Sequence, residues 1–126
     1  MGTTRNPAST VRGAVGAFGE DLAARYLAVR GMAILDRNWQ CDLGEIDLVA
    51  RNGDALVVCE VKTRRGAGFG TPAEAVTWRK AARLRKLAAR WLTEHPVTPA
   101  EIRIDVVCVV VPRSGSPVVE HLIGVC

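Results

Sequence analysis

Residues 44–64 read GEIDLVARNGDALVVCEVKTR, and this stretch decides the fold. Apolar and polar residues alternate on both sides of Asn52-Gly53, a dipeptide that favours a two-residue turn between antiparallel strands. We therefore predict a β-hairpin in which Arg51 lies opposite Asp54. Side chains along a strand alternate between two faces, so the hairpin separates its residues by type. One face is predicted to be uniformly apolar and comprises Ile46, Leu48, Ala50, Val57, Cys59 and Val61.

The other face of the predicted hairpin carries four charged residues: Glu45, Asp47, Glu60 and Lys62. In the predicted register, Asp47 and Glu60 are diagonal neighbours whose carboxylates can converge. Clustered carboxylates repel one another unless a cation lies between them. Mg²⁺ meets that need, because it is held by one or two carboxylates together with water and substrate phosphate. This face is therefore either a solvated polar surface or a metal site.

The segments outside the hairpin predict one α/β domain. Apolar spacing predicts helices over residues 14–30 and 73–94, and strands over residues 32–40, 102–111 and 118–124. Because the strand over residues 102–111 is apolar at nearly every position, we expect helices to cover both faces of a mixed sheet. We further expect a flexible tail over residues 1–13, a single domain over 14–126, and a mobile Gly-rich, basic loop over 63–72.

Composition excludes several classes of protein. The chain has 126 residues, is 48% hydrophobic and has a net charge of +4, which permits a polyanionic partner. It has no apolar run near the ~20 residues of a membrane span, and its first residues lack the apolar core of a secretory signal. We therefore expect a cytoplasmic protein without a membrane partner. The four cysteines lie far apart, without the spacing of a zinc site.

Two charged residues occupy unusual positions on the predicted helices. Glu20 borders the apolar side of the first helix, where it is either a boundary charge that favours the helix dipole or a site residue. Lys80 falls in the middle of the apolar face of the second helix, so its ammonium must either snorkel to water or meet a carboxylate or phosphate. The opposite side of that helix is a basic stripe, which is either solvated or follows a nucleic-acid backbone. The stripe comprises Arg79, Arg83, Lys86 and Arg90.

Two patterns in these residues resemble known proteins. Asp47, followed after twelve residues by Glu60-Val61-Lys62, resembles the PD-(D/E)XK nuclease signature, with Ile46 in place of its proline. The longer pattern GEIDLVA…EVKTR…FGTPAEAV…RK resembles the YraN-like family of uncharacterised bacterial proteins. The resemblance runs from about residue 16 to residue 111, which is most of the chain. It implies a three-layer α/β/α restriction endonuclease-like fold with a central mixed sheet, and phosphodiester cleavage that depends on Mg²⁺ or Mn²⁺.

The same resemblance implies roles for individual residues. Asp47, Glu60 and Val61 would be metal ligands, and Lys62 would orient or activate water. Glu20 matches a first-helix carboxylate of archaeal Holliday junction resolvases, and Glu45 is an additional candidate. Contacts with nucleic acid are expected from Lys80, Arg64, Arg65, Arg79 and Arg83.

Three functions are consistent with these patterns. The first is a metal-dependent endonuclease that cleaves DNA rather than RNA, with structure-selective cleavage in recombination or repair as one form. The second is a non-catalytic nucleic-acid-binding module, in which the basic stripe and loop make the contacts. The third is a protein-interaction domain that uses the fold as a scaffold. A homodimer is compatible with each of them.

Overall fold

The computed structural model, which describes residues 11–66 and 76–125, has the predicted order of helices and strands. The elements are α1 (Val11–Val29), β1 (Ala33–Cys41), β2 (Gly44–Asn52), β3 (Ala55–Arg65), α2 (Trp78–Thr93), β4 (Glu101–Val111) and β5 (Val118–Leu122). The predicted tail over residues 1–13 lies partly outside the described residues, and α1 begins within it, at Val11.

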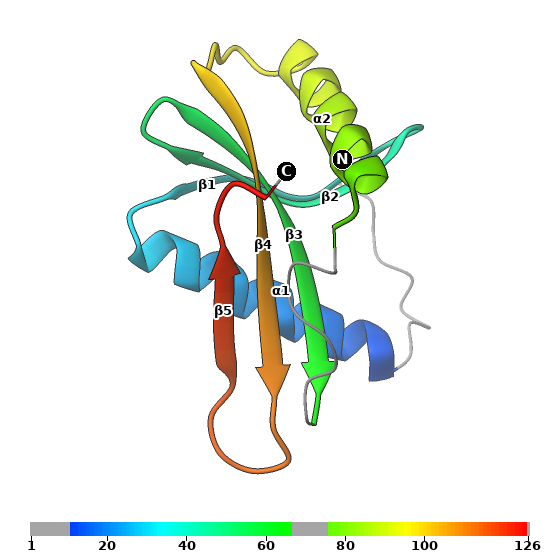
Figure 1. Ribbon diagram of the computed structural model, residues 1–126, viewed down its shortest axis with the longest axis vertical. Coiled ribbons are helices and arrows are strands. Elements are labelled where there is room, and N and C mark those ends of the chain that lie inside the picture. The colour runs from blue at the N-terminus through cyan, green and yellow to red at the C-terminus, as the bar shows by residue number, and fades with distance from the viewer. Residues whose placement is uncertain (1–10, 67–75, 126) are drawn as a thin grey trace.

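The strands form one mixed sheet in the order β1-β2-β3-β4-β5. β3 and β4 are parallel, with α2 between them in the chain, and the other neighbouring pairs are antiparallel. Figure 1 shows α1 crossing one face of this sheet and α2 lying over the other. The predicted three-layer α/β/α architecture is therefore confirmed.

Two apolar clusters hold the layers together. On the α2 side, Ile104 and Val106 of β4 pack with Trp91 and other apolar residues of α2. On the α1 side, Val107 and Val109 of the same strand pack with apolar residues of α1. β4 is apolar at consecutive positions because both of its faces are buried, as expected for a strand in the middle of a three-layer domain.

α1 ends as its sequence predicts. Gly31 has a φ of +94°, and the amide of Met32 donates to the carbonyl of Leu27 at 3.0 Å. This is the usual way for glycine to close a helix, because it adopts the left-handed conformation without strain. Neither α1 nor any other helix in the described part of the chain is long and apolar enough to cross a membrane.

The register of the hairpin differs from the prediction. The structure pairs Asn52 with Ala55 and Arg51 with Leu56, so Gly53-Asp54 forms the turn and Arg51 does not face Asp54. Gly53 has a φ of +60°, and a turn of the II′ type accepts Gly in its first central position, whereas a turn centred on Asn52-Gly53 would require positive φ at both residues. The register slides by two residues, an even number, so the slide does not exchange the two faces of the hairpin. Ile46 still differs from the prediction, because it packs in the cluster on the α2 side, whereas Leu48 and Ala50 pack in the cluster on the α1 side.

The boundaries of α2 and of the preceding loop also differ from the prediction. α2 begins at Trp78 rather than near residue 73, because Thr77 is extended and its hydroxyl accepts the amide N–H of Lys80 at 3.2 Å. Thr77 is thus the N-cap of the helix. At the other end of the predicted mobile loop, residues 63–65 belong to β3 and pair with β4. Residues 67–72 of that loop lie outside the described residues.

Candidate functional site

Asp47 lies where β2 separates from β3. Backbone pairing between the two strands ends at Leu48 and Cys59. Beyond this point, the amide N–H of Val61 on β3 donates to a side chain of β2 rather than to a backbone carbonyl of β2. The acceptor is Oδ2 of Asp47, at 2.9 Å. The contact fixes the carboxylate against β3. Val61, a predicted metal ligand, therefore contacts Asp47 through its amide.

Glu60 precedes Val61 on β3 and forms an ion pair with α2. The Lys80 Nζ lies 2.6 Å from Glu60 Oε2, and the Glu60 side chain is 13% exposed. Of the two alternatives for Lys80, the structure therefore shows the contact with a carboxylate rather than snorkelling. A partly buried pair of this length is a strong, charge-assisted interaction, so α2 is anchored to the sheet at this position.

These residues line a hollow of about 270 Å³ between the sheet and α2, which we call the α2-side hollow. Its polar lining brings together Glu45, Asp47, Glu60, Lys80 and Arg83. Gly44, Leu84 and Leu87 complete the wall. Three of the carboxylates expected from sequence thus share one cavity with two of the expected basic residues.

The remaining catalytic candidates line a second hollow. Glu20, Lys62 and Arg65 line a hollow of about 570 Å³ beside α1, the α1-side hollow, together with Val15, Gly16, Val61 and Thr63. Lys62 is not among the residues that line the α2-side hollow. Arg64 and Arg65 are in β3, where they pair with Val110 and Val111, rather than in a loop.

The ionisation of Asp47 connects the two hollows. Its pKa is raised from the ordinary 3.8 to about 7, chiefly because burial disfavours the charged form. The hydrogen bond from Val61 acts in the opposite direction, and the negative charges of Glu60, Glu20 and Glu45 raise the pKa further. Carboxylates from α1, β2 and β3 therefore act on one another, which is the electrostatic situation that a bound cation relieves.

The donor set fits a hard divalent ion held at an open site. Asp47 and Glu60 supply carboxylate oxygens, the ligands that Mg²⁺ prefers, and Mg²⁺ usually keeps several waters rather than filling an all-protein cage. Among residues 11–66 and 76–125, no three or more His, Cys, Asp or Glu side chains are arranged to enclose a metal. The residues thus suit Mg²⁺ or Mn²⁺ held by two carboxylates. Lys80 already neutralises part of the charge of Glu60.

Gly19 sets the position of Glu20, and sequence reasoning missed it. α1 approaches β3 so closely at this point that a Cβ on Gly19 would overlap the hydroxyl of Thr63 and lie 2.9 Å from its Cβ. The close approach carries the following residue, Glu20, to the α1-side hollow. The signal available in the sequence was the presence of three glycines, Gly13, Gly16 and Gly19, within a helical pattern, since glycine inside a helix often marks close packing.

We expect Gly19→Ala to lower the free energy of unfolding by about 1–3 kcal/mol, because the added methyl forces α1 away from β3. Gly16→Ala is the matched control on the same helix, since a Cβ there meets no atom within 4 Å. It should raise stability by about 0.5–1 kcal/mol through helix propensity alone. Urea denaturation of both variants checks this prediction, and a stabilised Gly19→Ala protein would contradict it.

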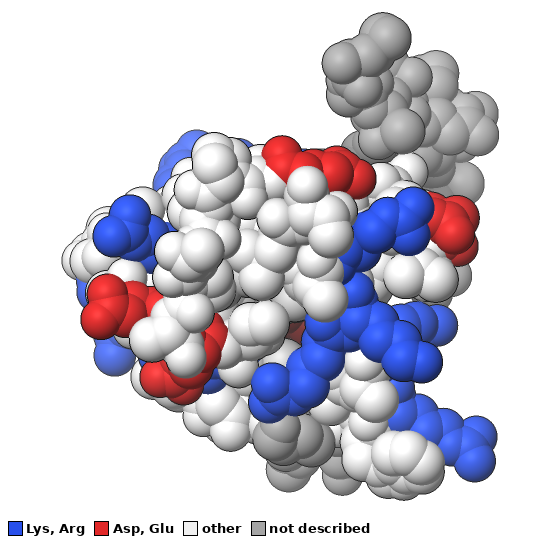
Figure 2. Space-filling model, turned by 90° about the horizontal axis from the view of Figure 1, so that it is seen from above, with Lys and Arg blue, Asp and Glu red and all other residues white. Residues whose placement is uncertain are grey.

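α2 presents a strongly basic surface beside the α2-side hollow. Its sequence, WRKAARLRKLAARWLT, contains six basic residues and no acidic residue. Lys80 points to Glu60, whereas the predicted nucleic-acid contacts Arg79 and Arg83 are exposed. Figure 2 shows Lys and Arg side chains gathered in a band over one half of the face seen from above. Such a band beside an acidic hollow favours a phosphate-bearing partner.

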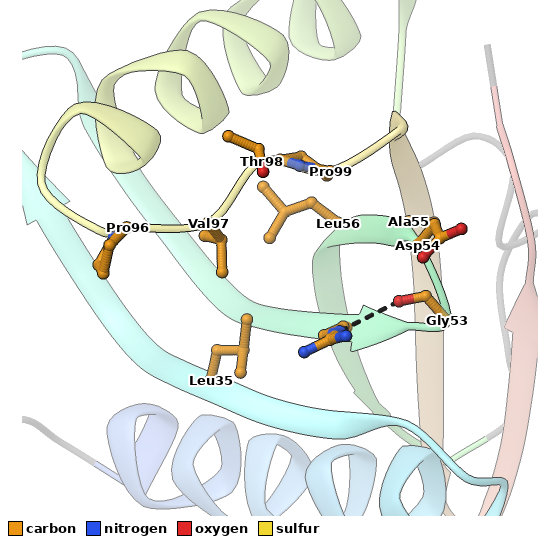
Figure 3. A pocket seen from close by; sticks show the side chains of 10 residues that line it. Leu35, Gly53, Asp54, Ala55, Leu56, Pro96, Val97, Thr98 and Pro99 are labelled. Carbon is orange, nitrogen blue, oxygen red and sulfur yellow. Dashed lines mark hydrogen bonds between the residues drawn. The ribbon is translucent and has the colours of Figure 1, made fainter.

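A third hollow, at the turn between β2 and β3, lacks a cluster of carboxylates. Its lining combines apolar residues such as Leu35, Leu56 and Val97 with a single acidic residue, Asp54, and a single basic residue, Arg51 (Figure 3). The guanidinium of Arg51 donates to the carbonyl of Gly53 at 3.1 Å, which keeps it at the turn. This end of β3 is about 17 Å from Glu60 at the rise of an extended strand. We therefore place the candidate site at the carboxylates.

Comparison with known proteins identifies the family. Residues 19–109 match the model of the uncharacterised protein family UPF0102. The chain belongs to this family. A UPF0102 protein of Nocardioides sp. is 56% identical over 97% of this chain and 98% of its own length. Relatives from Streptomyces griseus and Frankia alni are 61% and 59% identical, over 90% and 93% of this chain and 97% and 98% of their own lengths.

The UPF0102 family is the YraN-like family that the sequence pattern resembled, so this part of the expectation is confirmed. The matched residues 19–109 include all of α2, every residue that lines the α2-side hollow, and the residues of the α1-side hollow from Glu20 onward. The mixed sheet between two helices is consistent with a restriction endonuclease-like fold.

Proposed function

We propose that this UPF0102 protein is a metal-dependent endonuclease that hydrolyses phosphodiester bonds in DNA. The observation that carries the proposal is the placement of Asp47 and Glu60 in one hollow beneath a helix with six basic and no acidic residues. Acidic groups that hold a cation, next to basic groups that hold phosphates, are the two parts that such a reaction requires.

In this proposal, Asp47 and Glu60 hold Mg²⁺ or Mn²⁺. Val61, which follows Glu60 on β3, would be a further ligand of the ion. The chemistry that such an ion supplies is polarisation of a phosphoryl oxygen and activation of a water nucleophile. Lys62 and Glu20, together in the α1-side hollow, would orient the water and accept its proton. Lys80 would partly give up its ion pair with Glu60, so that Glu60 can bind the ion. Its ammonium would then contribute positive charge where negative charge develops on the phosphate.

The DNA backbone would run along α2. Arg79 and Arg83 are exposed on this helix, and Arg83 also lines the α2-side hollow. Arg64 and Arg65 lie at the end of β3, and Arg65 lines the α1-side hollow beyond Lys62. Basic groups on both sides of the carboxylates would therefore hold the phosphates on either side of the scissile bond. This arrangement suits a bent or branched DNA, as expected for recombination or repair.

The test is a cleavage screen of the purified chain on branched, single-stranded and duplex DNA and the corresponding RNAs, with Mg²⁺, Mn²⁺ or EDTA. We expect cleavage of DNA only when a divalent ion is present. Thermal unfolding provides an independent reading, since an ion at a hundred times its Kd stabilises the folded state by about 2.7 kcal/mol. A Glu60→Gln protein purified in the same way excludes a contaminating nuclease.

The outcomes separate the three functions. Absence of both metal-dependent cleavage and metal-dependent stabilisation would overturn the proposal. DNA binding without cleavage would then favour the nucleic-acid-binding module, and absence of DNA binding would favour the protein-interaction domain.

A further inference from the structure

Trp78, the first residue of α2, is a large apolar side chain that the fold leaves in water. It is 72% exposed, whereas Trp91 on the same helix is 2% exposed and lies in the core. Single exposed apolar residues are common on protein surfaces, so the exposure of Trp78 has significance only together with its neighbours.

The neighbours of Trp78 form a cationic surface held in a fixed position. The guanidinium carbon of Arg79 lies 5.5 Å from the centre of the indole ring, within the range of a cation–π contact. Thr77 caps the helix immediately before the ring and fixes where the helix begins. Lys80, which follows, reaches Glu60. The indole thus projects from a rigid helix end, and it leaves α2 on nearly the opposite side from Lys80, because residues two apart in a helix are about 200° apart around its axis.

An exposed aromatic ring beside cations suits a nucleic acid with unpaired bases. Each base has a π face that can stack on an indole, but in a continuous duplex both faces are covered by neighbouring bases. A cation next to the ring can contact the phosphate of the same nucleotide. The ring therefore distinguishes single-stranded from duplex segments, which phosphate contacts alone do not.

We propose that Trp78 is a stacking platform for an unpaired base of a DNA whose backbone lies along α2, so that the substrates of this protein are DNAs with a single-stranded segment. This inference rests on the proposed nuclease function and specifies its substrate class. Arg79 holds the indole of Trp78 in place through its cation–π contact. Arg83 contacts a phosphate, and this contact is the same for single-stranded and duplex DNA.

The test compares binding of fluorescein-labelled oligodeoxythymidine and of a blunt duplex of equal length, both in EDTA. We expect Trp78→Ala to weaken binding of the single strand about tenfold and of the duplex less than about twofold. Trp78→Phe retains an aromatic face and should retain most of the affinity. Arg83→Gln should weaken both probes and lower the slope of log Kd against log salt by about 1, whereas Trp78→Ala should leave the slope unchanged. Val29→Ala, at an 87% exposed apolar residue of α1, is the control for surface truncation.

The outcomes distinguish this inference from the function on which it rests. If the unaltered chain binds both probes and Trp78→Ala binds the single strand equally well, the stacking platform is wrong and the nuclease proposal stands. An equal loss on both probes also overturns it. If the unaltered chain binds neither probe, the stacking platform is wrong, and the nuclease proposal is decided by the cleavage and thermal-unfolding tests.

Discussion

Asp47→Asn is expected to reduce metal-dependent cleavage at least about a hundredfold and, at pH 8, to increase the stability of the folded chain. The loss of activity follows from removal of one of the two carboxylates that we propose to bind the metal, since even the groups that support metal ligands contribute 10–100-fold. Asparagine keeps an oxygen that can accept the amide N–H of Val61, so the change removes charge and preserves the hydrogen bond.

The gain in stability depends on pH. The Asp47 pKa rises from 3.8 to about 7 on folding, so between these values the folded chain binds more protons than the unfolded chain. The free energy of unfolding then falls as pH rises, by at most about 4 kcal/mol, and the loss is complete above pH 7. Asp47→Asn removes this dependence and should gain about 1–3 kcal/mol at pH 8 and nothing below pH 4.

Denaturation at several pH values checks the stability, and a cleavage assay with Mn²⁺ checks the activity. Asp54→Asn, at an exposed residue of the hairpin turn, is the matched control and should change neither. A pH slope that persists unchanged in Asp47→Asn would show that Asp47 is not the group responsible.

Asp105→Asn is expected to lower the free energy of unfolding by about 3–5 kcal/mol, the largest loss of stability from a single change. Asp105 lies in β4 and is 0% exposed. Its Oδ1 accepts from Arg103 Nε at 2.9 Å and from the amide of Gly124 at 3.0 Å. Its Oδ2 accepts from Arg103 at 3.0 Å and is 2.8 Å from His121 Nε2.

Asparagine cannot reproduce these contacts in either orientation of its amide. Arg103 donates to both oxygens, so the NH₂ group must face a guanidinium N–H, and the guanidinium loses its counter-charge in a site where it is 17% exposed. Urea denaturation against Asp54→Asn, which should change stability by less than about 0.5 kcal/mol, measures the effect. A loss below 1 kcal/mol would mean that water replaces the carboxylate.

The order of the elements and the faces of the hairpin could be predicted because they depend on local periodicity. A slide of two residues does not exchange the two faces of the hairpin, so the incorrect turn at Asn52-Gly53 did not misplace Asp47 or Glu60. The choice of turn itself could not be predicted, since Asn-Gly and Gly-Asp both suit two-residue hairpin turns. The observed register also determines that the amide that donates to Asp47 is that of Val61.

The sequence indicated residues of the site where a residue conflicted with its local pattern. Lys80 interrupts an apolar helix face, and its partner proved to be Glu60. Asp105 interrupts an apolar strand in the same way, but it was not singled out from the sequence, and two of its partners, His121 and Gly124, depend on how β5 pairs with β4. Lys62 could not be assigned to a hollow because its position depends on the packing of α1 against β3.

The parallel pairing of β3 with β4 has a consequence for the order of folding. Ala55 pairs with Glu101, and each later pair keeps the same long separation, so these contacts form only after α2 and its flanking segments have closed a large loop. The antiparallel strands β1, β2 and β3 need only short turns and can associate earlier. Asp47 and Glu60 are then brought near each other before Lys80 arrives. We therefore expect the carboxylates of the α2-side hollow to gain the positive charge of Lys80 only in the last, rate-limiting step of folding, when α2 docks on the sheet.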